Sequence, residues 1–214
     1  FNKAKLNTLV SLLSGRDFEE RDYKESIIED TFATLKQGFL NVVNSTNFRQ
    51  FELILQTAGF MSSKLLNSQS NLNVAYSIYL LLRDKKEDDE YIRSNVRRWF
   101  VFTILTSRYS GSYETKADQD LRQIEKLGFE EFFKEEELSV LSDSFWEVTL
   151  FRRLDTSSMQ NPIYNIYVAA QIFHNEGSLL IPSLQVQSLA VTMGDVHHIF
   201  PKAYLKENGI TDRK

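Results

Sequence analysis

Two adjacent histidines near the end of the sequence, His197 and His198, follow an aspartate, Asp195, and precede Pro201. A neutral imidazole titrates near neutral pH, so it suits a base that takes a proton from water. Carboxylate and imidazole groups also bind divalent cations, and such a cation would offset the charge that gathers on phosphate oxygens during phosphodiester hydrolysis. Asp195, His197 and His198 therefore offer both kinds of group that this hydrolysis needs.

The backbone limits how the two histidines can act together. In a regular strand His197 and His198 point to opposite faces, so both serve one cleft only if the strand bulges or ends there. Pro201 favours an ending, because proline cannot donate to a sheet ladder. A structural metal site is a competing interpretation, but such zinc sites usually have four ligands, often cysteines, and the chain has no cysteine. Lys202 lies just beyond and could contact a phosphate, although exposed lysines are more often only solvated.

The motif also resembles a known family. The stretch from Gly194 to Leu205, GDVHHIFPKAYL, looks like the first strand and following loop of HNH (ββα-metal) nucleases, specifically the C-terminal nuclease domain of GmrSD-type, modification-dependent restriction endonucleases. This resemblance implies that His198 is the general base, that His197 is a metal ligand and that Asp195 supports the metal site. It implies a divalent metal cofactor, magnesium by default for phosphate chemistry, with manganese, nickel or zinc also suited to an imidazole ligand.

A looser resemblance covers the segment from Arg97 to Ser112, which is similar to the helical region in the middle of such proteins. It implies that an N-terminal nucleotide-hydrolysing domain would precede this chain and that only that domain would use a nucleotide. It also implies plain or modified DNA as the substrate of a hydrolase in restriction and phage defence. HNH sites also need a later asparagine and a histidine or asparagine on the closing helix, and the sequence reaches Lys214 before any such segment. Asn208 lies too close to the motif to stand in. We therefore expect a piece of a longer protein that cannot cleave DNA alone.

The elements that must position the motif are mainly helices. Apolar residues recur at intervals of three and four, which is the helical period, over much of the chain. The predicted helices cover residues 3–14, 23–44, 48–58, 71–83, 91–105, 116–126, 130–140, 145–151 and 164–174. Pro162 suits the first turn of the last of these helices, and Gly177 suits its end.

The pattern changes after Gly177. Residues 179–182 and 184–187 lose the helical period, which indicates extended chain, and residues 191–200 are β-branched and alternating enough for a strand. We therefore predict a mainly α fold with two parts. A multi-helix linking domain covers residues 1–180, and the incomplete start of an HNH-type nuclease domain, with one or two strands, covers residues 181–214.

Composition excludes several classes. The 214 residues contain no apolar run long enough to cross a bilayer and no signal-peptide pattern, so we expect a cytoplasmic protein with no membrane partner. A formal net charge of −4 argues against coating nucleic acid by bulk charge. The densest basic group on a predicted helix, Arg93, Arg97 and Arg98, is interpreted as a solvated helix face rather than a phosphate-contacting stripe.

A non-catalytic helical module, which couples domains or holds a partner, is the alternative function. Its support is the number of amphipathic helices and the lack of any other polar cluster in the sequence. The polar loop over residues 106–113 is interpreted as an ordinary connection rather than a ligand site.

Overall fold

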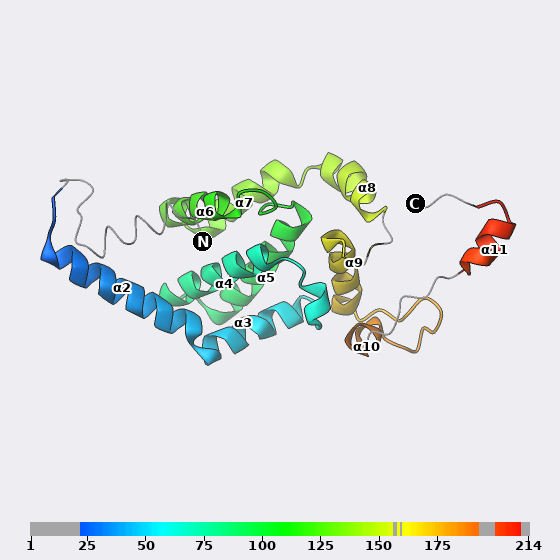
Figure 1. The fold of residues 1–214 in the computed structure, drawn as a ribbon, viewed down its shortest axis with the longest axis horizontal. Coiled ribbons are helices and arrows are strands. Elements are labelled where there is room, and N and C mark those ends of the chain that lie inside the picture. The colour runs from blue at the N-terminus through cyan, green and yellow to red at the C-terminus, as the bar shows by residue number, and fades with distance from the viewer. Residues whose placement is uncertain (1–21, 156–157, 159, 193–199, 211–214) are drawn as a thin grey trace.

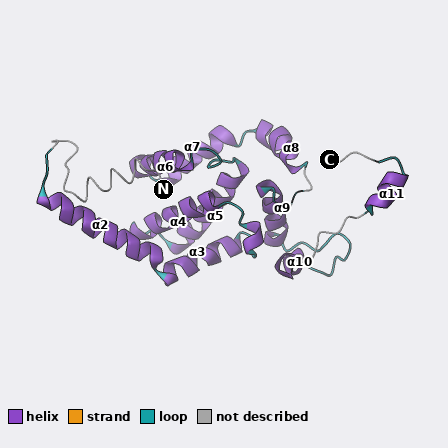
Figure 2. Cartoon of the chain, in the orientation of Figure 1, coloured by secondary structure: helices purple, strands orange, loops and turns teal. Residues whose placement is uncertain are grey.

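The computed structural model describes residues 22–155, 158, 160–192 and 200–210 of the chain. This part is mainly helical, as predicted, and Figure 2 shows its helices joined by loops, with no strand among the described residues. The elements in chain order are α2 (Glu25–Val43), α3 (Ser45–Thr57), the 3-10 helix η1 (Ser63–Leu65), α4 (Gln69–Asp84), α5 (Asp89–Leu105), α6 (Tyr113–Leu127), α7 (Phe129–Val140), the π-helix η2 (Phe145–Leu150), α8 (Phe151–Leu154), α9 (Pro162–Phe173), α10 (Val186–Thr192) and α11 (Lys202–Glu207). The predicted helix over residues 3–14 lies outside the described residues.

Helix α5 is the centre of the body, since it packs against α3, α4, α7 and α9 (Figure 1). Its Trp99 is fully buried and meets Phe129 and Phe133 of α7 at ring-centroid distances of 5.8 and 5.2 Å. Aromatic rings bury large apolar areas and favour such edge-to-face contacts. The abundance of phenylalanine in the sequence is thus partly accounted for by one aromatic cluster that holds α5 against α7.

Polar side chains fix where several helices begin. The backbone N–H groups of Thr46 and Asn47 donate to Oδ1 of Asn44, at 2.9 and 3.2 Å, so α3 begins at Ser45 rather than at the predicted residue 48. Such a cap satisfies amide groups that have no partner within the helix. Asp88 caps α5 in the same way. These caps set the starts of helices whose middles the apolar period already indicated.

Helix α2 (blue in Figure 1) extends outward from the start of α3 and has no buried residue. Its C-terminal end is tied to the body, because the hydroxyl of Tyr76 in α4 donates to the backbone oxygen of Val42 over 2.9 Å. The rest of α2 exposes several large apolar side chains to solvent. It is therefore a helix whose apolar residues do not contribute to the buried core.

The C-terminal part departs from the prediction. Helix α9 begins at Pro162, as expected, but ends at Phe173, because the chain turns through His174 and through Asn175, whose φ is +54°, before Gly177 is reached. Residues 186–192 form α10, so the predicted extended chain at 186–187 and the predicted strand at 191–192 are wrong. The physical reason is packing: Ala190 is buried against the core, and α10 lies against α9.

The predicted ββα segment has no counterpart among the described residues, and residues 193–199, which hold most of its first strand, lie outside them. The boundary near residue 180 between two domains stays a prediction. None of the described helices is at once long and apolar enough to cross a membrane.

Candidate functional sites

The residues predicted to perform the chemistry lie between α10 and α11. Asp195, His197 and His198 fall outside the described residues, so their mutual geometry stays a prediction. The described chain resumes at Phe200, and α11 begins with Lys202, whose predicted phosphate contact also stays a prediction. In Figure 1 α11 (red) lies apart from the helical body. In the sequence, the motif therefore stands directly before this short helix.

The N-terminal end of α11 is set by proline and aromatic residues. Pro201 occupies the position before the first helical residue, with φ of −57° and ψ of 140°. The rings of Phe200 and Tyr204 stack with centroids 5.9 Å apart and planes 19° apart. This local contact fixes how the chain enters α11, immediately after the two histidines.

Among the residues that the structure describes, no three histidine, aspartate or glutamate side chains lie close enough to hold a metal ion. The donor set of the motif itself fits such an ion, because Asp195 offers carboxylate oxygens and His197 an imidazole nitrogen.

A buried ionic cluster lies elsewhere, between the α5–α6 loop and helices α6 and α7. Nε and Nη2 of Arg108 donate to the two carboxylate oxygens of Asp120, each over 2.7 Å, and Nη1 donates to Glu136 over 2.6 Å. The hydroxyl of Tyr109 also donates to Asp120, over 2.8 Å, and Lys116 approaches the same carboxylate at 3.3 Å. Both oxygens of Asp120 are thus saturated by donors.

The electrostatics of this cluster favour permanently paired groups. Burial lowers the pKa of Arg108, but its hydrogen bonds and its attraction to Asp120 and Glu136 outweigh burial, so the pKa is raised above its ordinary value. Burial, and then the charge of Asp120, raise the pKa of Tyr109 well above its usual range. The guanidinium also lies over Trp99, 5.2 Å from its ring centroid. With its donors and acceptors engaged by one another, this cluster is suited to hold helices together.

Sequence reasoning missed this cluster. The loop over residues 106–113 was interpreted as an ordinary connection, yet it supplies Arg108 and Tyr109. Their partners Asp120 and Glu136 lie 12 and 28 positions beyond Arg108, so no local spacing signals the contact. A polar loop that holds an arginine and a tyrosine beside an acidic helix was the only available signal.

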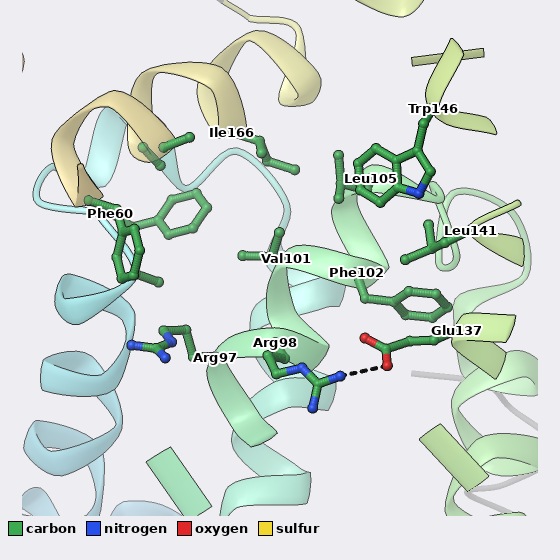
Figure 3. Close-up of a pocket in the computed structure, with 14 residues that line it drawn as sticks. Phe60, Arg97, Arg98, Val101, Phe102, Leu105, Glu137, Leu141, Trp146 and Ile166 are labelled. Carbon is green, nitrogen blue, oxygen red and sulfur yellow. Dashed lines mark hydrogen bonds and ion pairs between the residues drawn. The ribbon is translucent and has the colours of Figure 1, made fainter. Parts of the chain in front are cut away.

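An open groove of about 420 Å³ lies between α5, α7, η2 and α9 (Figure 3). Its lining is mostly apolar and includes Phe60, Val101, Leu141, Trp146 and Ile166. Figure 3 shows the charged side chains Arg97, Arg98 and Glu137 along one side of it. The volume falls within the range of small-ligand sites, and the lining is of the apolar kind that such sites share.

The three clustered arginines have separate partners. Arg93 pairs with Glu90 at 3.1 Å and is exposed, and Arg98 pairs with Glu137 at 2.6 Å, with its side chain 53% exposed. Their interpretation as a solvated face agrees with this exposure. Arg97 differs, because it is half-buried beside the groove and lies over the ring of Phe173 at 5.3 Å. The three cations do not act as one stripe.

Comparison of the chain with protein-family models, with curated proteins and with solved structures found no match. Its function is therefore inferred from its own residues. Two features bear on that inference: the Asp-Val-His-His motif beyond α10, and the apolar groove beside α5.

Proposed function

We propose that this chain belongs to an HNH-type DNA endonuclease of the restriction type, in which a helical body carries the opening part of the nuclease site. The observation that carries the proposal is the run Asp195-Val196-His197-His198-Ile199-Phe200-Pro201-Lys202. It offers a base, metal-binding groups and a phosphate-binding cation within one short segment. Support also comes from α11, which begins at Lys202 and lies apart from the helical body in Figure 1.

In the proposed reaction His198 acts as the general base. Its neutral imidazole accepts a proton from water as the water oxygen attacks the phosphorus of a DNA phosphodiester, in line with the ester oxygen that leaves. His197, with Asp195 in support, would hold a divalent ion, magnesium by default, and that ion would offset negative charge on the phosphate. Lys202 pairs with a phosphate of the substrate.

A nucleotide-hydrolysing domain of the same protein is the partner of the helical body and the nuclease. The substrate is plain or modified DNA, and the protein works in the cytoplasm as part of phage defence. Each of these statements depends on the resemblance of the motif to GmrSD-type enzymes.

The test is plasmid cleavage by the longer protein that contains this chain, with magnesium or manganese present. We expect His198→Ala to abolish cleavage because water is no longer deprotonated. His174→Ala is the matched control, since His174 is an exposed C-cap residue of α9 and lies outside the motif. It should leave cleavage unchanged. Cleavage that persists in the His198 variant would remove the assigned base and with it the proposal.

A second candidate, a non-catalytic coupling module, is favoured by one specific observation. The groove beside α5 is open and apolar and is not filled by the described residues, which suits the binding of another part of the same protein. Suppose that the longer protein cleaves neither plain nor modified DNA, although it and its His198→Ala variant are both folded. The coupling module then becomes the better description.

A further inference from the structure

Helix α2 carries a regular apolar stripe that faces solvent. The α2 stripe consists of Ile28, Phe32, Leu35, Phe39 and Val42, all of them exposed, with Phe32 and Phe39 at 59% and 64%. Their spacing alternates four and three residues, which is the heptad spacing of helices that pack side by side along their length. A stripe with this spacing stays in line with one partner helix.

The exposure of the α2 stripe is energetically unfavourable without a partner. Most of the stability of a helix in a protein comes from packing its apolar face, and α2 has no buried residue. Gly38 in its interior weakens it further. Contiguous exposed apolar surface on a protein typically marks a site of association. A second helix packed on the α2 stripe would therefore stabilise α2 and bury its exposed apolar side chains.

The charges beside the stripe indicate which helix this is. Glu29 and Lys36 each follow a stripe residue by one position and lie seven residues apart, so they line the same edge. Among the described residues neither takes part in an ion pair. If two copies of α2 run antiparallel with Phe32 opposite Leu35, Glu29 of each copy meets Lys36 of the other. The edge is thus complementary to itself under a two-fold rotation.

A parallel pair fits less well. In that arrangement Lys36 faces Thr31, which is uncharged and half-buried, and Glu29 faces Lys24, which precedes the first helical residue of α2. An antiparallel pair also places the two helical bodies at opposite ends of the paired helices, because each α2 extends outward from the start of α3 (Figure 1). Charge and shape both favour the antiparallel arrangement.

We propose that α2 is a dimerisation surface, on which a second copy of this chain packs its own α2 antiparallel through the α2 stripe. Two Glu29–Lys36 contacts related by the two-fold axis fix the register. Only residues of α2 enter this contact, so the dimer does not depend on the nuclease proposal.

The test is sedimentation equilibrium of the 214-residue chain and its charge-reversal variants. We expect a concentration-dependent dimer for the natural chain. Glu29→Lys alone, and Lys36→Glu alone, each place like charges at two contacts and should raise the dissociation constant about tenfold. The double variant Glu29→Lys with Lys36→Glu restores both contacts with the two charges exchanged. Its dissociation constant should therefore be close to that of the natural chain. Glu125→Lys, at an exposed position of α6, is the control and should leave the dissociation constant unchanged.

Two outcomes would overturn the proposal. One is a natural chain that stays monomeric at concentrations up to about 100 μM, which is well above the dissociation constants of specific complexes. The other is a double variant as weak as either single variant. A parallel pair would give that second result, because the basic side chain introduced at position 29 would then face Lys24. Helical content measured by circular dichroism confirms that each variant is folded, and a Phe39→Asp variant should be monomeric.

Discussion

Arg108 and Asp120 form a two-pronged ion pair, Nε to Oδ2 and Nη2 to Oδ1, with both distances 2.7 Å and with only 5% and 1% of the two side chains exposed. Burying two charges costs desolvation energy, which this geometry offsets only while both partners are present. The pair joins the start of the α5–α6 loop to the middle of α6. Stability of the helical body should therefore depend strongly on either member.

The substitution Asp120→Asn should destabilise the chain by about 3 kcal/mol, because it leaves Arg108 buried with only Glu136 as a charged partner. Unfolding in urea, followed by circular dichroism, measures this change. Asp118→Asn is the control on the same helix, since Asp118 forms an exposed i,i+4 pair with Arg122. It should cost less than about 1 kcal/mol. Equal effects of the two substitutions would contradict the role assigned to Asp120.

The substitution Tyr109→Phe should show a pH-dependent effect. At neutral pH it removes a hydrogen bond to a carboxylate, at a cost of about 1.5–3 kcal/mol. Burial and Asp120 raise the pKa of Tyr109 in the folded chain, so its contribution is complete below the unfolded pKa of about 10 and is lost as pH rises beyond it. The stability gap between natural chain and variant should therefore be smaller at about pH 10.5 than at about pH 8. A gap that stays constant would show that Tyr109 ionises equally in both states.

Gly59 should tolerate no side chain. Its φ is +92°, and a Cβ there would lie 2.0 Å from the backbone oxygen of Ala169 in α9. Gly128 is the matched control, because its φ of +83° is similar but a Cβ meets no atom within 4 Å. Gly128→Ala should cost about 1–3 kcal/mol from its backbone conformation alone, with φ of +83° and ψ of 158°. Gly59→Ala should cost clearly more, measured by thermal unfolding, because the end of α3 must move away from α9.

The two tryptophans should differ in their access to a quencher. Trp146 lines the groove and is 47% exposed, whereas Trp99 is fully buried. Acrylamide should quench the fluorescence of the natural chain in two populations, and Trp146→Phe should leave only the protected one. Any occupant of the groove should protect Trp146 as well. If Trp146→Phe leaves the accessible fraction unchanged, the groove is not open in solution.

Prediction from sequence succeeded where a helix buries one face. The apolar period of residues 71–83 and 91–105 indicated α4 and α5 to within a few residues, because their apolar faces form the core. It failed for α10, where Val186 and Val191 suggested extended chain but contact with α9 decided the outcome. Local propensity is weak in so short a segment, and tertiary packing overrides it.

The candidate sites divide in the same way. A motif of adjacent residues, such as His197 and His198, is visible in a sequence, although its geometry is not. The Arg108–Asp120–Glu136 contact and the groove around Val101 are assembled from separate helices, so only a fold reveals them. Charged residues can be counted in a sequence, but their pairing depends on how the helices pack.

The π-helix η2 has a consequence for changes in chain length. Phe145 and Leu150 are five positions apart, the interval of a π turn, whereas Leu150 and Leu154 are four apart, the interval of an α turn. All three pack in one small apolar cluster with Leu105 and Ile163. Deleting one residue between Phe145 and Leu150 would reduce the interval between them from five positions to four. In an ordinary α-helix the two side chains would then still contact the same neighbours. Evolution can thus remove a residue here while the next helix keeps its orientation.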